Sequence, residues 1–145
     1  MDRDAPAPAA ALVLGAAGLI PFVGLSLLAI LGRADLFGLP VRPALAAYAA
    51  IIASFLGGIR WGLAARGGGS ADYLIAVLPS LLAWAALAAP APWDLRLIGA
   101  LVLAWGAVDQ DLPRRGLAPR WLGRLRLALS GVAGLALLAA GYLGV

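Results

Sequence analysis

The chain has 145 residues, of which 63% are hydrophobic and 12% are charged, and it contains neither Cys nor His. A soluble domain of this length is about half apolar and a quarter charged, so the composition argues against a soluble globular protein. Without thiols or imidazoles, the chain lacks disulfides, imidazole bases and nearly every zinc, haem or iron–sulfur ligand set, and we expect no cofactor and no metal.

The formal net charge is +4, and the charged residues are all Arg or Asp. We attribute the absence of Lys and Glu to the codon usage of the genome. A basic soluble protein would suggest nucleic acid as a partner. Here the apolar composition favours arginines gathered in the loops on one side of a membrane, and we expect no nucleic acid partner.

Five apolar runs are long enough, or nearly so, to cross a bilayer, for which about 20 residues are needed. They cover residues 9–32, 43–65, 72–89, 93–108 and 121–144. The chain is therefore predicted to be an all-α membrane protein, with a short tail at 1–8 and a single five-span domain at 9–145. The tail lacks the basic start and the cleavage site of a signal peptide, so we expect the first run to be retained.

Local signals mark where these helices bend and begin. Pro21 has no N–H to donate, which predicts a kink in the first helix. Pro43 suits the first position of the second helix. Ser70 or Asp72 is expected to cap the third helix. The most polar stretch of the chain, residues 109–120, is predicted to be the loop before the last helix.

An odd number of spans places the termini on opposite sides of the membrane. Eight arginines then lie at or near the face of the N-terminus, and three lie at the other face: Arg33, Arg42 and Arg96. Because cytoplasmic loops carry the excess of basic residues, we predict the N-terminus inside and the C-terminus outside. The predicted location is the bacterial inner (cytoplasmic) membrane, with multiple passes.

Small residues recur at helical spacing in the second span, within the stretch SFLGGIRWG at 54–62. Ser54, Gly58 and Gly62 lie four apart, and Gly57 adjoins them. Small residues at this spacing let two helix backbones approach closely in lipid. We predict a helix-packing motif of these four residues, although Gly and Ala are so abundant that composition alone offers an alternative explanation.

Arg60 lies in the same stretch, about six residues or roughly 9 Å inside the end of the second span. A charge at that depth is costly if it faces lipid, yet its side chain is long enough to reach the interface. The best partners are Asp109 and Asp111 at the same end of the fourth span, and we predict a charged pair of Arg60 with Asp109. The pair could position a ligand or proton, or it could dock two helices; alternatively, Arg60 reaches lipid phosphate.

A basic run follows the fourth span: Arg114, Arg115, Arg120, Arg124 and Arg126. Each basic residue near a membrane surface contributes about 1 kcal/mol to binding anionic lipid. We predict an interfacial basic cluster that contacts anionic headgroups. The same charges would also set the topology, and the sequence does not separate these two roles.

Groups suited to catalysis are few. No serine has an imidazole to activate it. The glycines at 67–69 lack the Lys and the strand of a phosphate-binding loop. Asp109 and Asp111 supply too few ligands to indicate a metal site. An enzyme embedded in the membrane is therefore the weakest of the functional hypotheses.

The order of motifs adds a resemblance to a family. The motifs are GAAGLIPF at 15–22, the stretch at 54–62, LPSLLAW at 78–84, Asp109, and PRWLGRLRL at 119–127. Together they resemble the bacterial family catalogued as domain of unknown function 3429, whose relatives include the transmembrane protein 69 type of the mitochondrial inner membrane. The resemblance implies a membrane location but no established activity. A His can occupy the place of Arg60 in this family, which implies a basic contact rather than an obligatory proton relay.

Two functional hypotheses remain. The first is an accessory or assembly component that packs on itself as a homo-oligomer or on other subunits of a larger inner-membrane complex. The alternative is a small transporter or channel with a polar site around Arg60 and Asp109. A water-filled cavity reaching Arg60 would favour transport, whereas an Arg60 sealed against its partner would favour docking.

Overall fold

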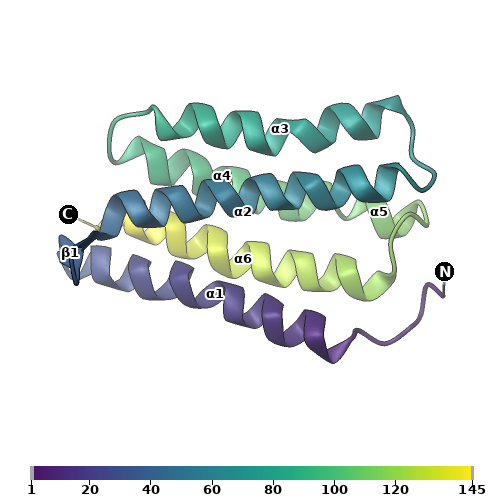
Figure 1. Ribbon diagram of the computed structural model, residues 1–145, viewed down its shortest axis with the longest axis horizontal. Helices are drawn as coiled ribbons and strands as arrows, with labels where there is room; N and C mark the ends of the chain where they lie inside the picture. Colours follow the sequence, from purple (N-terminus) through teal and green to yellow (C-terminus); the bar gives the residue numbers. More distant parts are fainter. Residues whose placement is uncertain (1, 145) are drawn as a thin grey trace.

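The structure is a computed structural model that describes residues 2–144; Met1 and Val145, at the ends of the predicted tail and domain, lie outside the described residues. The elements in chain order are α1 (Ala9–Ile30), β1 (Asp35–Leu36), β2 (Leu39–Pro40), α2 (Val41–Ala64), α3 (Ser70–Leu87), α4 (Trp93–Val108), α5 (Asp111–Arg114) and α6 (Arg120–Leu143). The two strands form a small antiparallel hairpin between α1 and α2. The rest of the architecture is helical (Figure 1).

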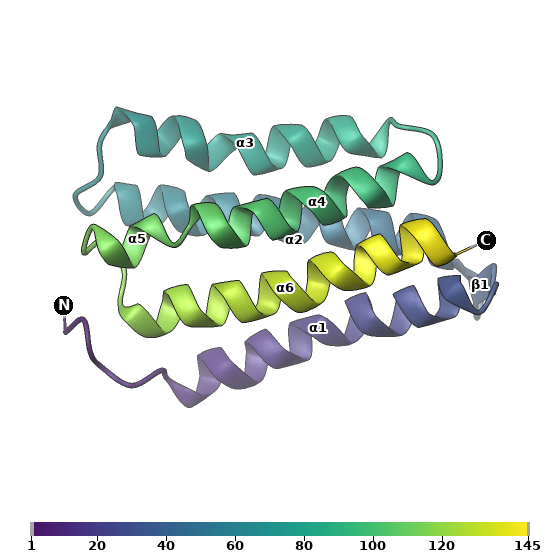
Figure 2. The same ribbon diagram turned by 180° about the vertical axis from the view of Figure 1, so that it is seen from behind.

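The five long helices lie side by side and alternate in direction (Figure 1). The most extensive packing is of α4 on α6 and of α2 on α3, and α1 covers α6 and α2. Seen from behind, α6 runs between α1 and α4 (Figure 2). The ends of the chain lie at opposite ends of the bundle, and α5 lies at the same end as the N-terminal tail (Figures 1 and 2).

Small residues bring the paired helices close together. A Cβ atom on Gly57 would lie 2.2 Å from the carbonyl oxygen of Ala76, so α2 and α3 meet backbone to backbone there. Between α4 and α6, a Cβ atom on Gly106 would lie 2.6 Å from the Cβ atom of Ser130. In lipid, close backbone approach of this kind supplies the dispersion contacts that hold helices together.

Aromatic side chains join α1 to α2. The ring centroids of Phe22 and Tyr48 are 4.9 Å apart. The Tyr48 hydroxyl donates a hydrogen bond of 2.7 Å to the carbonyl oxygen of Gly18. Tyr48 therefore packs its ring in the core while its hydroxyl group finds an acceptor, as a buried phenol requires. Pro21 lies inside the continuous helix α1.

The outer surface of the bundle is apolar. Large side chains such as Leu14, Ile20 and Trp84 are 71%, 69% and 75% exposed. Four helices, α1, α2, α3 and α6, are long and apolar enough to cross a membrane. The 16 residues of α4 extend about 24 Å, somewhat less than the hydrocarbon core of about 30 Å. The protein is thus an all-helical, multi-pass membrane protein.

Three local predictions need correction. Helix α2 begins at Val41, so Pro43 occupies its third position, where the N–H still has no acceptor within the helix. Helix α3 begins at Ser70, so Gly69 holds the N-cap position, and of the two predicted residues Asp72 takes part in capping as the third helical residue of a capping box. Asp72 lies in the first turn and accepts a hydrogen bond of 3.0 Å from the Gly69 N–H. The polar loop before the last helix contains the short helix α5.

Arginines at the end of the bundle opposite α5 dock helices on one another. Arg42 at the start of α2 donates to Asp94 at the start of α4 across 2.7 Å. Arg96 donates to the carbonyl of Gly141 on α6, and its guanidinium lies 4.0 Å from the ring centroid of Tyr142. These contacts hold the short helix α4 against α2 and α6.

Candidate functional site

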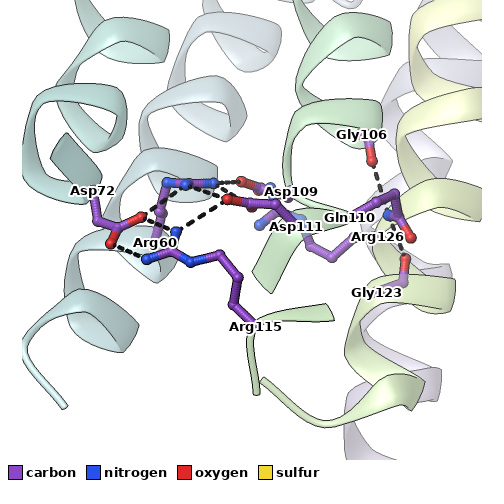
Figure 3. Close-up of polar contacts among 9 residues, drawn as sticks. All are labelled: Arg60, Asp72, Gly106, Asp109, Gln110, Asp111, Arg115, Gly123 and Arg126. Atoms are coloured by element: carbon purple, nitrogen blue, oxygen red, sulfur yellow. Dashed lines mark hydrogen bonds and ion pairs between the residues drawn. The ribbon is translucent and has the colours of Figure 1, made fainter. Parts of the chain in front are cut away.

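Arg60 is the centre of a polar cluster at the α5 end of the bundle (Figure 3). It is fully buried, one turn before the end of α2. Its Nη1 atom donates to the carboxylates of Asp109 and Asp111 at 3.0 and 2.9 Å. Its Nη2 atom donates to Asp72 and to the second oxygen of Asp111, both at 2.9 Å. One guanidinium thus meets three carboxylates from three other segments.

Asp72 shares its carboxylate between two arginines. Besides the hydrogen bond from Arg60, it accepts one from each terminal nitrogen of Arg115, both at 2.7 Å. Paired parallel bonds of this kind are the strongest geometry that guanidinium and carboxylate form. The Asp72 side chain is 2% exposed, and the first turn of α3 holds it in place. Asp72 therefore connects α2 to the segment that follows α5.

Asp109 connects α4 to two further helices. It follows the last residue of α4, and its side chain is 1% exposed. One oxygen accepts from Arg60 on α2, and the other accepts from Arg126 on α6. Beside it, the Gln110 amide donates to the carbonyls of Gly106 and Gly123, both at 2.9 Å. The end of α4 is thereby tied to α2 and α6.

Asp111 and Arg115 form the outer edge of the cluster. Their side chains are 38% and 45% exposed, and the distance between them is 3.1 Å. Both lie outside the long helices. Burial acts to raise the pKa of Asp111, but hydrogen bonds from Arg60 and Arg115 outweigh it and hold that pKa below its usual value. Hydrogen bonds to Asp72 and Asp111 raise the pKa of Arg115.

The six residues form a charge-balanced network, in which three arginines face three aspartates. We call it the Arg60 network; its members are Arg60, Asp72, Asp109, Asp111, Arg115 and Arg126. It joins α2, α3, α4, α5 and α6 at one end of the bundle (Figure 3). An unpaired charge in a low-dielectric region is very costly, and mutual pairing offsets that cost. The arrangement therefore suits a structural role, in which ion pairs hold the helix ends together.

The inner side of the network is tightly packed around Asp109 and Arg126. The hollow bordered by Asp109 and Arg126 has no room for a water molecule. Within the described residues, the Nε atom of Arg60 and the Nε and Nη1 atoms of Arg126 are buried without a hydrogen-bond partner. Across residues 2–144, no group of three or more His, Cys, Asp or Glu side chains is arranged so that it could hold a metal ion. The carboxylates of the network instead face guanidinium groups.

The structure brings Arg60 and Asp109 together, and it resolves which acid the arginine meets: it pairs with Asp109 and Asp111 at once. Sequence reasoning assigned Asp72 to helix capping, in which it does take part, and missed its contact with Arg60. A signal was available, because Arg60 lies one turn before the end of α2 and Asp72 lies in the first turn of α3. A tight helix hairpin brings such positions to the same level.

The structure divides the predicted basic cluster into two groups. Arg115 and Arg126 point into the Arg60 network. The remaining three, Arg114, Arg120 and Arg124, stay exposed outside it. Arg120 pairs with Asp4 of the N-terminal tail at 2.9 Å. Two of the five arginines therefore belong to the Arg60 network, and the other three lie on the surface at the same end of the bundle.

The predicted helix-packing motif is also divided. Gly57 lies in the contact with Ala76 on α3. Ser54, Gly58 and Gly62 face outward, and no atom beyond the adjoining turns of α2 lies within 4 Å of a Cβ built on either glycine. The Ser54 hydroxyl donates to the carbonyl of Ala50 in its own helix. We call these three residues the outer stripe; within the described chain no other helix packs against its two glycines, and Ser54 borders a shallow groove between α2 and α3.

Comparisons with known proteins agree with a membrane protein. In an alignment of 139 positions that covers 90% of the chain, it is 39% identical to transmembrane protein 69 of Xenopus tropicalis. The match covers 52% of that protein, so the chain spans about half the length of this curated relative. No solved structure matches. The family model described as protein of unknown function (DUF3429) matches residues 7–142. The chain belongs to the DUF3429 family of membrane proteins.

Proposed function

We propose that this protein is an accessory or assembly component of the bacterial inner membrane, which packs through the outer face of α2 on a second copy of itself. The observation that carries the proposal is the outer stripe. Ser54, Gly58 and Gly62 leave a strip of backbone open along the helix. In lipid, such a strip admits another helix at short distance, and the same strip on both partners is self-complementary.

The burial of Arg60 among its ion pairs supports this role over the alternative of a small transporter or channel. A transport site needs a route for water or solute to its charged groups. Arg60 is fully buried, and the hollow beside Asp109 has no room for a water molecule. All three carboxylates already face arginines. A closed set of pairs is suited to holding helices rather than to binding and releasing a solute.

A cross-linking experiment tests self-association. Because the chain has no Cys, a single Gly58→Cys substitution gives one thiol on the outer stripe. We expect oxidation in membranes to produce a disulfide-linked dimer. Leu14→Cys is the matched control, since Leu14 is 71% exposed on α1 near the same end of the bundle. Adducts only with other proteins would redirect the role to a larger complex, and an unlinked chain, or equal linking at Leu14, would refute docking through this face.

We further propose five spans, with the N-terminus inside. Support comes from the termini at opposite ends of the bundle and from α4, which lies between α3 and α6 as a full member of the layer (Figures 1 and 2). Ala34→Cys and Ala65→Cys place thiols in exposed loops at the two ends. In intact cells, an impermeant thiol reagent should label Ala34→Cys and leave Ala65→Cys unlabelled. The reverse pattern would overturn the orientation, and labelling of both would overturn the topology.

The alternative function has its own test. Purified protein in liposomes should show no flux of ions or protons beyond that of empty liposomes. Arg60→Leu should weaken folding and assembly without altering flux. Reproducible flux in the native protein that Arg60→Leu abolishes in folded, reconstituted protein would favour transport.

A further inference from the structure

A basic pocket lies at the α5 end of the bundle, separate from the Arg60 network. Its volume is about 500 Å³, and it is lined by Arg3, Gln110, Pro113, Arg114, Arg120 and Arg124. Four of these six residues are arginines, and they come from the N-terminal tail, the end of α5 and the first two turns of α6. We call it the tail pocket.

The N-terminal tail completes this pocket by folding back over the start of α6. Arg3 donates from Nη2 to the carbonyls of Pro113 and Arg114 at 2.9 and 3.4 Å. The backbone N–H of Arg120 donates to the carbonyl of Arg3 at 3.1 Å. Figures 1 and 2 show the tail beside α5 and the start of α6. The pocket is therefore assembled by specific contacts between distant segments.

The pocket holds more positive charge than its surroundings balance. Asp4 pairs with Arg120, which leaves the other three arginines. Among residues 2–144, Arg3, Arg114 and Arg124 form no ion pair with a carboxylate. The Arg60 network and the Arg42–Asp94 pair are each neutral, so a substantial part of the net charge of +4 is concentrated here. Several guanidinium groups around one hollow form an anion site, and a phosphate group matches their fork geometry.

The depth of the pocket selects the kind of anion. Arg120 and Arg124 lie in the first two turns of α6, a helix long and apolar enough to cross the membrane. The pocket therefore opens at the level where a span leaves the hydrocarbon, which is the level of lipid headgroups. We infer that the tail pocket binds the phosphate group of an anionic phospholipid, with the acyl chains alongside α1 and α6.

The test uses the full chain purified in mild detergent, with phosphatidylglycerol and phosphatidylcholine as probes in native mass spectrometry. The pocket variant is Arg114→Gln with Arg124→Gln; within the described residues neither side chain makes a hydrogen bond. The control variant is Arg33→Gln with Arg66→Gln, which removes the same charge from exposed positions outside the pocket. Melting curves check that both variants remain folded.

We expect native protein and the control variant to retain phosphatidylglycerol in preference to phosphatidylcholine. The pocket variant should bind phosphatidylglycerol about thirtyfold more weakly, and Arg124→Gln alone about fivefold more weakly. Equal losses in the control variant would overturn the site in favour of diffuse surface charge. Displacement of the lipid by inorganic phosphate would overturn the lipid source in favour of a free phosphate ion. No preference for phosphatidylglycerol in the native protein would overturn the inference altogether.

Discussion

Arg60 donates to Asp109 across 3.0 Å, although 49 residues separate them in the chain. The contact joins the end of α2 to the end of α4, and the second oxygen of Asp109 continues it to Arg126 on α6. A single charged residue in an apolar helix thereby links helices that lie far apart in the sequence. The first prediction concerns this residue.

Arg60→Leu should destabilise the fold by about 3–5 kcal/mol, because it leaves Asp72 and Asp109 buried without their shared guanidinium. Unfolding of the purified protein by a denaturing detergent measures the change. Arg66→Leu, which removes an exposed charge from the following turn, should stay within about 0.5 kcal/mol of the native protein. Native-like stability of Arg60→Leu would show that the network does not hold the bundle.

Neighbouring glycines on α2 should respond in opposite ways to alanine. Gly57→Ala would place a Cβ atom 2.2 Å from the carbonyl oxygen of Ala76, so α2 and α3 must separate, at a cost of about 1–3 kcal/mol. Gly58→Ala meets no atom within 4 Å and should be neutral or gain up to about 1 kcal/mol from better helix propensity. Melting temperatures in detergent compare the two. Equal effects would contradict the rotation of α2 described above.

The stability of the protein should fall in acid partly through Asp111. Its pKa in the folded protein lies below the usual value near 3.9, so its ion pairs contribute stability above about pH 4 and lose it as the pH falls further. Melting temperatures between pH 7 and pH 3 follow the loss. Asp111→Asn should lower the melting temperature at pH 7 and flatten its decline in acid. Asp35→Asn, at an exposed carboxylate that forms no ion pair within residues 2–144, should keep the native profile. A native profile for Asp111→Asn would rule out this contribution.

Tyr48→Phe should cost about 0.5–1 kcal/mol, because it removes the hydrogen bond of 2.7 Å to Gly18 while keeping the ring beside Phe22. The same detergent unfolding assay measures the loss. Tyr142→Phe is the control, since the Tyr142 ring beneath Arg96 is retained and no hydrogen bond of its hydroxyl is removed within the described chain. If both variants lost the same amount of stability, the cause would be the loss of a phenol hydroxyl as such rather than the contact between α1 and α2.

Several features could be predicted from the order of residues alone. An apolar run of about 20 residues must satisfy its backbone internally in lipid, so the helical, membrane-spanning character follows from composition. Helix ends were predicted to within a few residues, because prolines and glycines interrupt the apolar pattern. The level of Arg60 and of Asp109 along the bundle also follows, since counting residues from a helix end gives depth.

Other features required the tertiary structure, because sequence spacing gives depth along a helix but not its rotation toward a partner. Consecutive residues differ by about 100° around the axis, and packing alone decided that Gly57 faces α3 while Gly58 faces outward. The same limit divided the basic run, sending Arg126 inward to Asp109 and leaving Arg124 at the tail pocket. The sequence by itself determined that the helices lie in lipid and which charged residues they carry. The packing of the helices determined which of these charges form pairs, because a buried charge is stable only where a partner from another segment reaches it.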